Sequence, residues 1–263
     1  MGYRIGFDIG STTIKAVVLD ENNQICYKSY ERHKAQVRQK ALDKLVELKK
    51  YTKEPFKFAI SGSGALGLSE QGELPFVQEV FASATGVSKL YPETDCAIEL
   101  GGEDAKILFF QGSVEQRMNS TCAGGTGAFI DQMATLLNMS LEEMNEASLN
   151  YHRLYPIASR CGVFAKTDIQ PLINQGVDKC DLCASIFQAV VDQTITSLAQ
   201  GRKIEGNILF LGGPLYFMSG LRNRFVETLK LSDVQVNCPD TAINFVALGT
   251  AICADQELSL IHI

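Results

Sequence analysis

Apolar positions divide the chain into short predicted strands, mostly in its first half, and longer predicted helices, mostly in its second half. Alternating or continuous runs of apolar and β-branched residues predict strands over 3–8, 14–20, 24–31, 57–60, 95–100, 105–110, 114–118 and 207–211. Apolar residues at helical spacing predict helices over 35–50, 75–90, 127–137, 141–147, 164–173, 182–198, 220–229 and 244–254. The last helix is rich in small residues, so we expect it to pack closely against the first part of the chain.

The order strand, turn, strand, turn, strand occurs twice, beginning at Tyr3 and again at Asp95. In both copies an acidic residue, Asp8 or Glu99, stands at the end of the first strand, and a glycine-containing turn follows. The repetition favours an internal duplication with two lobes, one formed by 1–93 and 241–263 and the other by 94–240. The alternative is a chance coincidence of two common hairpins.

Composition narrows the class of partner. The formal net charge is −6 and the chain has no long run of Lys or Arg, which argues against nucleic acid or an anionic membrane as the main partner. No apolar stretch reaches the roughly 18 residues needed to span a bilayer. The start of the chain is typical of a strand that contains an Asp, and not of a signal peptide, so we expect a cytoplasmic protein.

The first turn has the chemistry of a phosphate-binding site, with the sequence Asp8-Ile9-Gly10-Ser11-Thr12-Thr13. Gly10 permits a tight turn, and the N–H and hydroxyl groups that follow it can hold phosphate oxygens. Asp8 is a candidate catalytic carboxylate that would hold hydrated Mg²⁺. A Walker loop would instead need a Lys directly after its glycines and then a helix. An ordinary hairpin turn with a capping Asp is the alternative.

Two further glycine motifs follow, Glu99-Leu100-Gly101-Gly102-Glu103-Asp104 and Gly212-Gly213-Pro214. Glu99 is the second candidate catalytic carboxylate, and the adjacent glycines of the last motif would let the backbone approach an adenosine closely. The order and spacing of the three motifs resemble the phosphate-1, phosphate-2 and adenosine motifs of the sugar kinase, Hsp70 and actin group. That resemblance implies an α/β protein with two ribonuclease-H-like lobes that bind ATP or ADP with Mg²⁺ between them.

Two cysteines are candidate metal ligands, because Cys122 and Cys161 each stand shortly before a predicted helix. A helix N-terminus carries partial positive charge, which stabilises a thiolate and favours an anionic cluster. Two cysteines cannot complete the four-thiolate shell of an iron–sulfur cluster, but a two-fold homodimer would supply four. From the residues alone, two buried structural thiols are the alternative.

Together the motifs resemble the ATP-dependent activators of 2-hydroxyacyl-CoA dehydratases and the ATPase subunits of benzoyl-CoA reductase. The resemblance covers nearly the whole chain, is carried by 5–13, 97–106, 119–136, 160–169 and 207–214, and extends especially to the activator-like repeats of large fused acyl-CoA dehydratase activases. It implies a homodimer in which Cys122 and Cys161 of both subunits hold one [4Fe–4S] cluster. Gly125 and Gly127, which follow Cys122 in the sequence, are expected nucleotide contacts.

The activity implied by the resemblance is ATP hydrolysis coupled to electron transfer. Ferredoxin or flavodoxin would supply one electron, ATP would change the angle between the lobes, and the electron would pass to a dehydratase or reductase. Smaller activators carry Asp at the position of Glu99 and Gln at that of Glu103, which alters the expected geometry of hydrolysis. A small-molecule kinase, for instance of an amino sugar, and a non-catalytic nucleotide-dependent regulator are alternatives on the same fold.

The remaining cysteines and the histidines are not predicted to be ligands. Cys180 and Cys183 form a C-x-x-C, which we interpret as packing, with metal or redox chemistry as the alternative. Three further cysteines lie in apolar runs and are expected to be buried, namely Cys26, Cys96 and Cys253. The histidines, His33 among them, have no ligand-like spacing, and the sequence assigns them no role.

Overall fold

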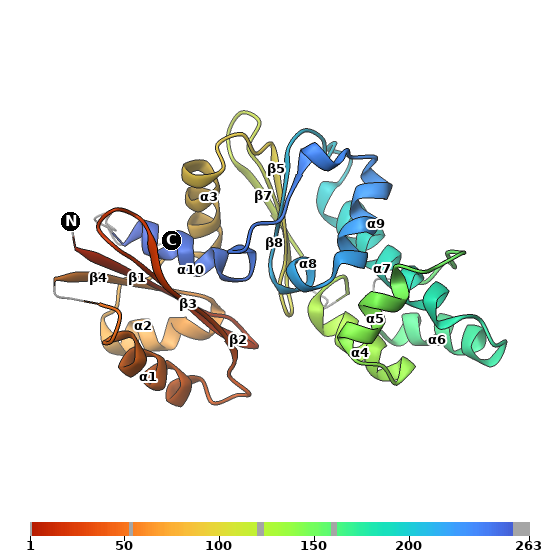
Figure 1. Cartoon of the computed structure of the whole chain (residues 1–263), viewed down its shortest axis with the longest axis horizontal. Helices are drawn as coiled ribbons and strands as arrows, with labels where there is room; N and C mark the ends of the chain where they lie inside the picture. Colours follow the sequence, from red (N-terminus) through yellow and green to blue (C-terminus); the bar gives the residue numbers. More distant parts are fainter. Residues whose placement is uncertain (1, 53–54, 120–123, 159–161, 255–263) are drawn as a thin grey trace. The chain divides into compact units, whose positions relative to one another are not determined.

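The computed structural model describes residues 2–52, 55–119, 124–158 and 162–254 (Figure 1). The chain forms two compact units, one of the residues up to Pro92 together with those from Ile243 onward, and one of Glu93–Ala242. Each unit has its own sheet and its own hydrophobic core.

The first unit contains a four-stranded sheet in the order β3-β2-β1-β4. Its strands are β1 (Tyr3–Ile9), β2 (Thr13–Leu19), β3 (Ile25–Arg32) and β4 (Phe56–Ser61). The first three form an antiparallel meander, whereas β4 runs parallel to β1. Because successive side chains of a strand point to opposite faces, Ile5, Phe7 and Ile9 enter one core while Gly6 and Asp8 lie on the other face.

Helices cover both faces of this sheet (Figure 1). One face carries α1 (Val37–Leu48) and α2 (Leu66–Gly72), and the other carries α10 (Phe245–Cys253), which is backed by α3 (Glu79–Leu90). A Cβ added at Gly6 of β1 would lie 2.1 Å from the carbonyl oxygen of Ala247, so only glycine permits this approach of α10. The predicted return of the last helix to the first part of the chain is therefore confirmed.

The second unit repeats the same strand order and adds one short strand at the edge, giving β7-β6-β5-β8-β9. Its strands are β5 (Cys96–Leu100), β6 (Ala105–Phe109), β7 (Glu115–Met118), β8 (Ile208–Leu211) and β9 (Val236–Asn237). As in the first unit, the first three strands are antiparallel and the next one, β8, runs parallel to the first. The shared topology is what an internal duplication predicts.

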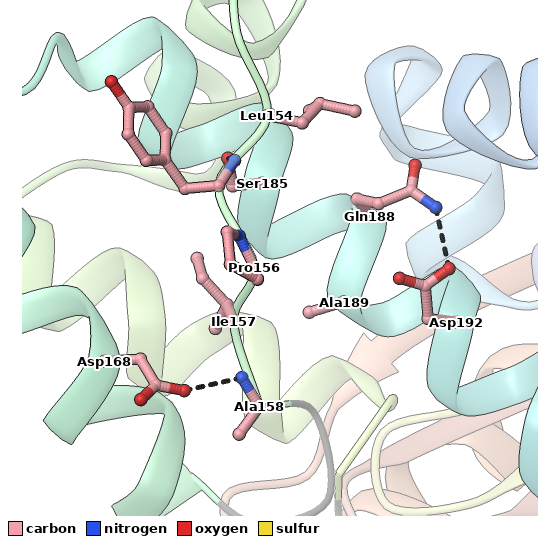
Figure 2. Close-up of a pocket in the computed structure, with 10 residues that line it drawn as sticks. Leu154, Pro156, Ile157, Ala158, Asp168, Ser185, Gln188, Ala189 and Asp192 are labelled. Carbon is pink, nitrogen blue, oxygen red and sulfur yellow. Dashed lines mark hydrogen bonds between the residues drawn. The ribbon is translucent and has the colours of Figure 1, made fainter.

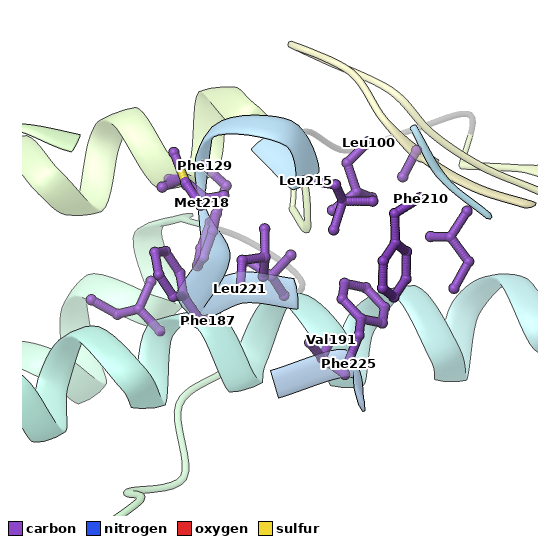
Figure 3. Close-up of a cluster of buried hydrophobic side chains, with 14 of the residues drawn as sticks. Leu100, Phe129, Phe187, Val191, Phe210, Leu215, Met218, Leu221 and Phe225 are labelled. Atoms are coloured by element: carbon purple, nitrogen blue, oxygen red, sulfur yellow. The ribbon is translucent and has the colours of Figure 1, made fainter. Parts of the chain in front are cut away.

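The helices of the second unit are α4 (Gly127–Leu137), α5 (Leu141–Ser148), α6 (Gly162–Asn174), α7 (Lys179–Thr194), α8 (Gly213–Phe217) and α9 (Ser219–Leu229). Figure 3 shows the core around α7, where Phe187 and Val191 belong to one cluster with Phe210 and Phe225. Among the described helices, the segment Lys179–Ala199 is long and apolar enough to cross a membrane, but 67% of its most apolar window is buried inside the protein. Core packing explains that composition.

The sequence patterns misplaced some elements. The helix predicted over 75–90 begins only at Glu79, because Phe76 forms a β-bridge with Ile60 at the end of β4. Neither α2 nor α8 was predicted, since both are short, contain glycine and show too few turns for a helical period.

Candidate functional site

In each unit, an acidic residue near the end of the first strand pairs with a lysine near the start of the second strand. In the first unit, Asp8 of β1 lies opposite Lys15 of β2, and the lysine Nζ is 2.7 Å from Asp8 Oδ2. In the second unit, Glu99 of β5 lies opposite Lys106 of β6, and Nζ is 3.6 Å from Glu99 Oε1. Both acids and Lys106 are buried, so the neighbouring strand supplies the cation that compensates each carboxylate.

The two lysines are functional candidates that the sequence patterns missed. Each stands seven positions after its acid, and this repeated offset was the available signal. Lys106 also lies 2.8 Å from Oδ2 of Asp104, a residue of the second turn, while Glu103 beside it is exposed. A lysine at the base of a phosphate-binding turn can supply positive charge to a nucleotide as well as to the acid.

The first turn presents backbone donors at the end of β1. The Gly10 N–H donates to the Thr13 carbonyl at 3.0 Å and closes the turn. Within the described part of the chain, the N–H groups of Ser11 and Thr12 have no protein acceptor, and Ser11 is exposed. Consecutive N–H groups left open in this way suit phosphate oxygens. The open donors of Ser11 and Thr12 therefore fit the expected phosphate-binding role, whereas Gly10 and Thr13 close the turn.

A buried hydroxyl next to Asp8 fits bound water or a hydrated ion. Ser61 ends β4, pairs with Asp8 across the parallel ladder and so shares its face of the sheet. Its Oγ is buried and has no hydrogen-bond partner among the described residues, a situation that ordered water or a ligand usually relieves. The described residues hold no group of three metal-ligating side chains. These donors suit a Mg²⁺ ion that keeps several of its waters and binds nucleotide phosphates. They suit less well an ion whose ligands all come from the protein.

The second turn is joined to the start of α4. As in the first turn, the Gly101 N–H donates to a carbonyl three residues on, that of Asp104, at 2.8 Å. The carbonyls of Gly101 and Gly102 accept the N–H groups of Gly127 at 3.0 Å and Ala128 at 2.7 Å. Two of the first donors of α4 are thus used by the protein, and are not left for an anion as the sequence suggested. Gly127, an expected nucleotide contact, instead makes one of the two hydrogen bonds that join the second turn to α4.

Other glycines of the expected site also have internal explanations. Gly212 has φ +88°, and a Cβ there would lie 2.0 Å from the carbonyl oxygen of Leu100 at the end of β5. Gly125 has φ +80° and lies against α7, where a Cβ would be 3.2 Å from a side-chain carbon. Gly213 and Pro214 form the first turn of α8. The second turn, α4 and the third motif therefore meet at one end of the second sheet.

The chain before residue 159 is held by side chains that cap its backbone. The N–H groups of His152 and Arg153 donate to Asp181 Oδ1 at 2.7 and 3.0 Å, and these bonds hold the pKa of Asp181 below its usual range. Tyr155 N–H donates to Ser185 Oγ at 2.8 Å. This extended segment therefore lies against α7 without belonging to a sheet.

The last of these hydrogen bonds joins one residue that precedes Cys161 in the sequence to one that follows it. Ala158 N–H donates to Asp168 Oδ2 of α6 at 2.8 Å, and both residues line the pocket drawn in Figure 2. Cys122 and Cys161, the expected ligands, lie outside the described residues. In the first turn of α6, which follows Cys161 in the sequence, the apolar Val163 and Phe164 are 72% and 65% exposed.

The remaining described cysteines differ in burial: three are buried, Cys180 and Cys238 are half-buried, and one is exposed. Cys183 is buried, its Sγ lies 3.8 Å from Met139 Sδ, and burial raises its pKa to about 12. Burial and nearby Asp178 also raise the pKa of Cys180 above its usual value. Cys96 and Cys253 are buried as expected, whereas the prediction for Cys26 is wrong, because it is exposed on β3.

Comparison with solved structures first defines the class of fold. The structure matches a ROK family glucokinase from Streptomyces griseus with a TM-score of 0.52 at 14% identity, covering 97% of this chain and 100% of that one. That likeness shows the actin-like sugar kinase fold with ribonuclease-H-like units.

Two structures are far more similar. The dehydratase component A from Acidaminococcus fermentans has a TM-score of 0.85 at 26% identity, covering 96% and 97%. The 2-hydroxyisocaproyl-CoA dehydratase activator from Clostridium difficile, with bound ADPNP, has 0.83 at 27%, covering 96% and 94%.

Sequence comparison then gives the family. Residues 5–254 match the BadF/BadG/BcrA/BcrD ATPase family, and the chain belongs to it. The 2-hydroxyisocaproyl-CoA dehydratase activator of Clostridioides difficile is 28% identical over 97% of this chain and 96% of its own length. The activator of lactoyl-CoA dehydratase of Anaerotignum propionicum is 29% identical, covering 96% and 97%.

Proposed function

We propose that this chain is an ATP-dependent one-electron donor that activates a 2-hydroxyacyl-CoA dehydratase or a related reductase. Membership of an ATPase family supports the nucleotide chemistry, and the relatives named as dehydratase activators support the kind of partner. A ferredoxin or flavodoxin would be the electron donor. The observation that carries the proposal is the hydrogen-bonded joint between the second turn and α4.

Each turn contributes its own groups to ATP binding in this proposal. In the first turn, the N–H groups of Ser11 and Thr12 hold phosphate oxygens, and Lys15 adds positive charge at its base. Asp8 orients water, and bound Mg²⁺ would supply further charge to the phosphates through its own waters. In the second unit, Glu99 is the candidate carboxylate that orients the attacking water, and its ion pair with Lys106 holds the carboxylate in position.

Through the two hydrogen bonds between the second turn and α4, bound ATP would act on the part of the chain that bears the cluster. Gly127, whose N–H is bound to the Gly101 carbonyl, stands only five positions after Cys122 in the sequence. A nucleotide that reorients the second turn must therefore either move the start of α4 or break its two hydrogen bonds. ATP can favour the partner-docked state to the extent that it binds that arrangement more tightly.

Ligand count and surface chemistry support the homodimer in this proposal. Each chain has two cysteines at the expected positions, so two chains supply four. A [4Fe–4S] cluster on Cys122 and Cys161 of both subunits would supply the one-electron chemistry. The exposed Val163 and Phe164 stand two and three positions after Cys161 in the sequence, in the first turn of α6, and a second copy is the partner that would cover them.

Anaerobic reconstitution of matched serine variants tests the proposal. Wild type and the control Cys180→Ser should form homodimers with about four irons per dimer, whereas Cys122→Ser and Cys161→Ser should lose the iron yet keep nucleotide affinity. Asp8→Ala should keep the iron and lose ATP hydrolysis. Retention of the cluster in Cys122→Ser, or a monomer with a full cluster, would refute the ligand assignment. Full hydrolysis by Asp8→Ala would refute the nucleotide site.

A further inference from the structure

A buried histidine directly after β3 is hydrogen-bonded to the first turn. The backbone N–H of His33 donates to the Thr12 carbonyl at 3.2 Å, and its Nε2 lies 3.0 Å from the Gly10 carbonyl oxygen. The side chain is only 4% exposed. One residue therefore contacts the turn on both sides of Ser11, although nothing in its sequence spacing indicated a role.

A second contact determines which ring nitrogen carries the proton. The N–H of Ala35 donates to His33 Nδ1 at 3.2 Å, so Nδ1 must present a lone pair. In the neutral imidazole the proton then lies on Nε2, which donates to the Gly10 carbonyl. The ring thus joins two backbone groups with one donor and one acceptor, and its orientation is fixed at both ends.

The two residues after His33 adopt left-handed backbone conformations, which residues other than glycine rarely do. Lys34 and Ala35 have φ of 48° and 63°, and Gln36 N–H donates to the His33 carbonyl at 2.8 Å. Positive φ at both central residues is the pattern of a type I′ turn, for which Gly and Asn are the usual residues. Neither is present, so the bond from Ala35 to the imidazole contributes to holding this turn.

The opposite side of the first turn is also braced. A Cβ at Gly62, just after β4, would lie 2.2 Å from the Ile9 carbonyl oxygen, and one at Gly64 would lie 3.2 Å from the Gly10 carbonyl oxygen. The turn is therefore enclosed by close backbone contacts on one side and by His33 on the other. The carbonyls of Gly10, Thr12 and Thr13 accept hydrogen bonds from the protein, while the N–H groups of Ser11 and Thr12 stay open within the described part of the chain.

We propose that His33 is a positioning residue for the first phosphate-binding turn. It does not touch the nucleotide; it holds the Gly10 and Thr12 carbonyls inward so that the donors of Ser11 and Thr12 are preorganised for phosphate. This inference rests on the proposed ATP site. It assigns a role in nucleotide affinity to a side chain outside all three glycine motifs.

Two amide variants of the full chain separate the two ring contacts. His33→Gln places an amide where Nε2 lies and can restore the bond to Gly10, whereas His33→Asn places one where Nδ1 lies and can restore only the bond to Ala35. Titration with ADP and with a non-hydrolysable ATP analogue gives the dissociation constants, steady-state hydrolysis gives kcat and KM, and thermal unfolding without nucleotide gives stability.

We expect His33→Asn to weaken nucleotide binding and to raise KM by about 5–10-fold with little change in kcat, as the loss of one hydrogen bond would. His33→Gln should bind within about 3-fold of wild type, even if both variants unfold at the same temperature. The inference is overturned if the two variants bind nucleotide equally well, or if affinity follows thermal stability alone. Failure of the wild type to bind nucleotide would instead refute the proposed function itself.

Discussion

Replacing Gly127 by Ala tests the joint between the second turn and the start of α4. A Cβ at this position would lie 3.1 Å from the Gly101 carbonyl oxygen, 3.3 Å from Pro214 Cγ and 3.4 Å from Gly102 Cα. All three neighbours belong to the turn or to the third motif, and two of them are backbone atoms. The new methyl group therefore has to push α4 away from the turn by a few tenths of an ångström.

The size of the effect follows from the two hydrogen bonds at risk. The bonds from Gly127 to Gly101 and from Ala128 to Gly102 are 3.0 and 2.7 Å long, and each contributes about 1 kcal/mol net. The higher helix propensity of Ala offsets about 0.5–1 kcal/mol of their loss. We expect Gly127→Ala to be about 0.5–1.5 kcal/mol less stable than wild type, and nucleotide affinity to fall by about 2–10-fold.

A second helical glycine provides a matched control. Gly67 in α2 has no atom within 4 Å of an added Cβ, so Gly67→Ala should stabilise the protein by about 0.5–1 kcal/mol and leave nucleotide affinity unchanged. Urea denaturation and nucleotide titration of both variants measure the difference. If Gly127→Ala were stabilised like Gly67→Ala and bound nucleotide as tightly as wild type, the joint would not couple the turn to the helix.

Three further changes test the packing and electrostatics of each unit. Gly6→Ala should cost at least about 3 kcal/mol of unfolding free energy in urea, because its Cβ would lie 2.1 Å from the Ala247 carbonyl oxygen of α10; a loss below about 1 kcal/mol would contradict that contact. Lys15→Met should cost about 2–4 kcal/mol, because it leaves buried Asp8 uncompensated, and adding Asp8→Asn should restore much of the loss in a double-variant cycle. The ionised Asp181 stabilises the fold above its ordinary pKa of 3.8, and this contribution is lost as pH falls through its lower folded pKa. Asp181→Asn should therefore be about 1–2 kcal/mol less stable at neutral pH and lose less stability between about pH 5 and pH 2, and an unchanged acid profile would exclude this role.

Much of the architecture and the family could be predicted from the sequence, because those signals are local. A strand that ends in an acid and enters a glycine turn is written in consecutive residues, and it occurs at both Asp8 and Glu99. Helical and strand periods also extend over short windows, so most elements lie within a few residues of their predicted bounds. The exceptions occur where distant contacts prevail, as at Phe76, which pairs with β4 and delays the start of α3.

Tertiary structure decided what surrounds those turns. Asp8 and Lys15 meet because antiparallel pairing places them opposite each other, and the same register brings Glu99 to Lys106. Gly212 owes its conformation to the Leu100 carbonyl, more than 100 positions earlier in the chain.

The same holds for the residues that fix the turns in place. His33 lies 23 positions from Gly10, and Gly127 meets Gly101 only once α4 has packed against its sheet. A sequence pattern records the conformation that neighbouring residues prefer, but these contacts exist only when separate strands and helices have closed on one another. The turns themselves could therefore be predicted from the sequence, whereas their supports could not.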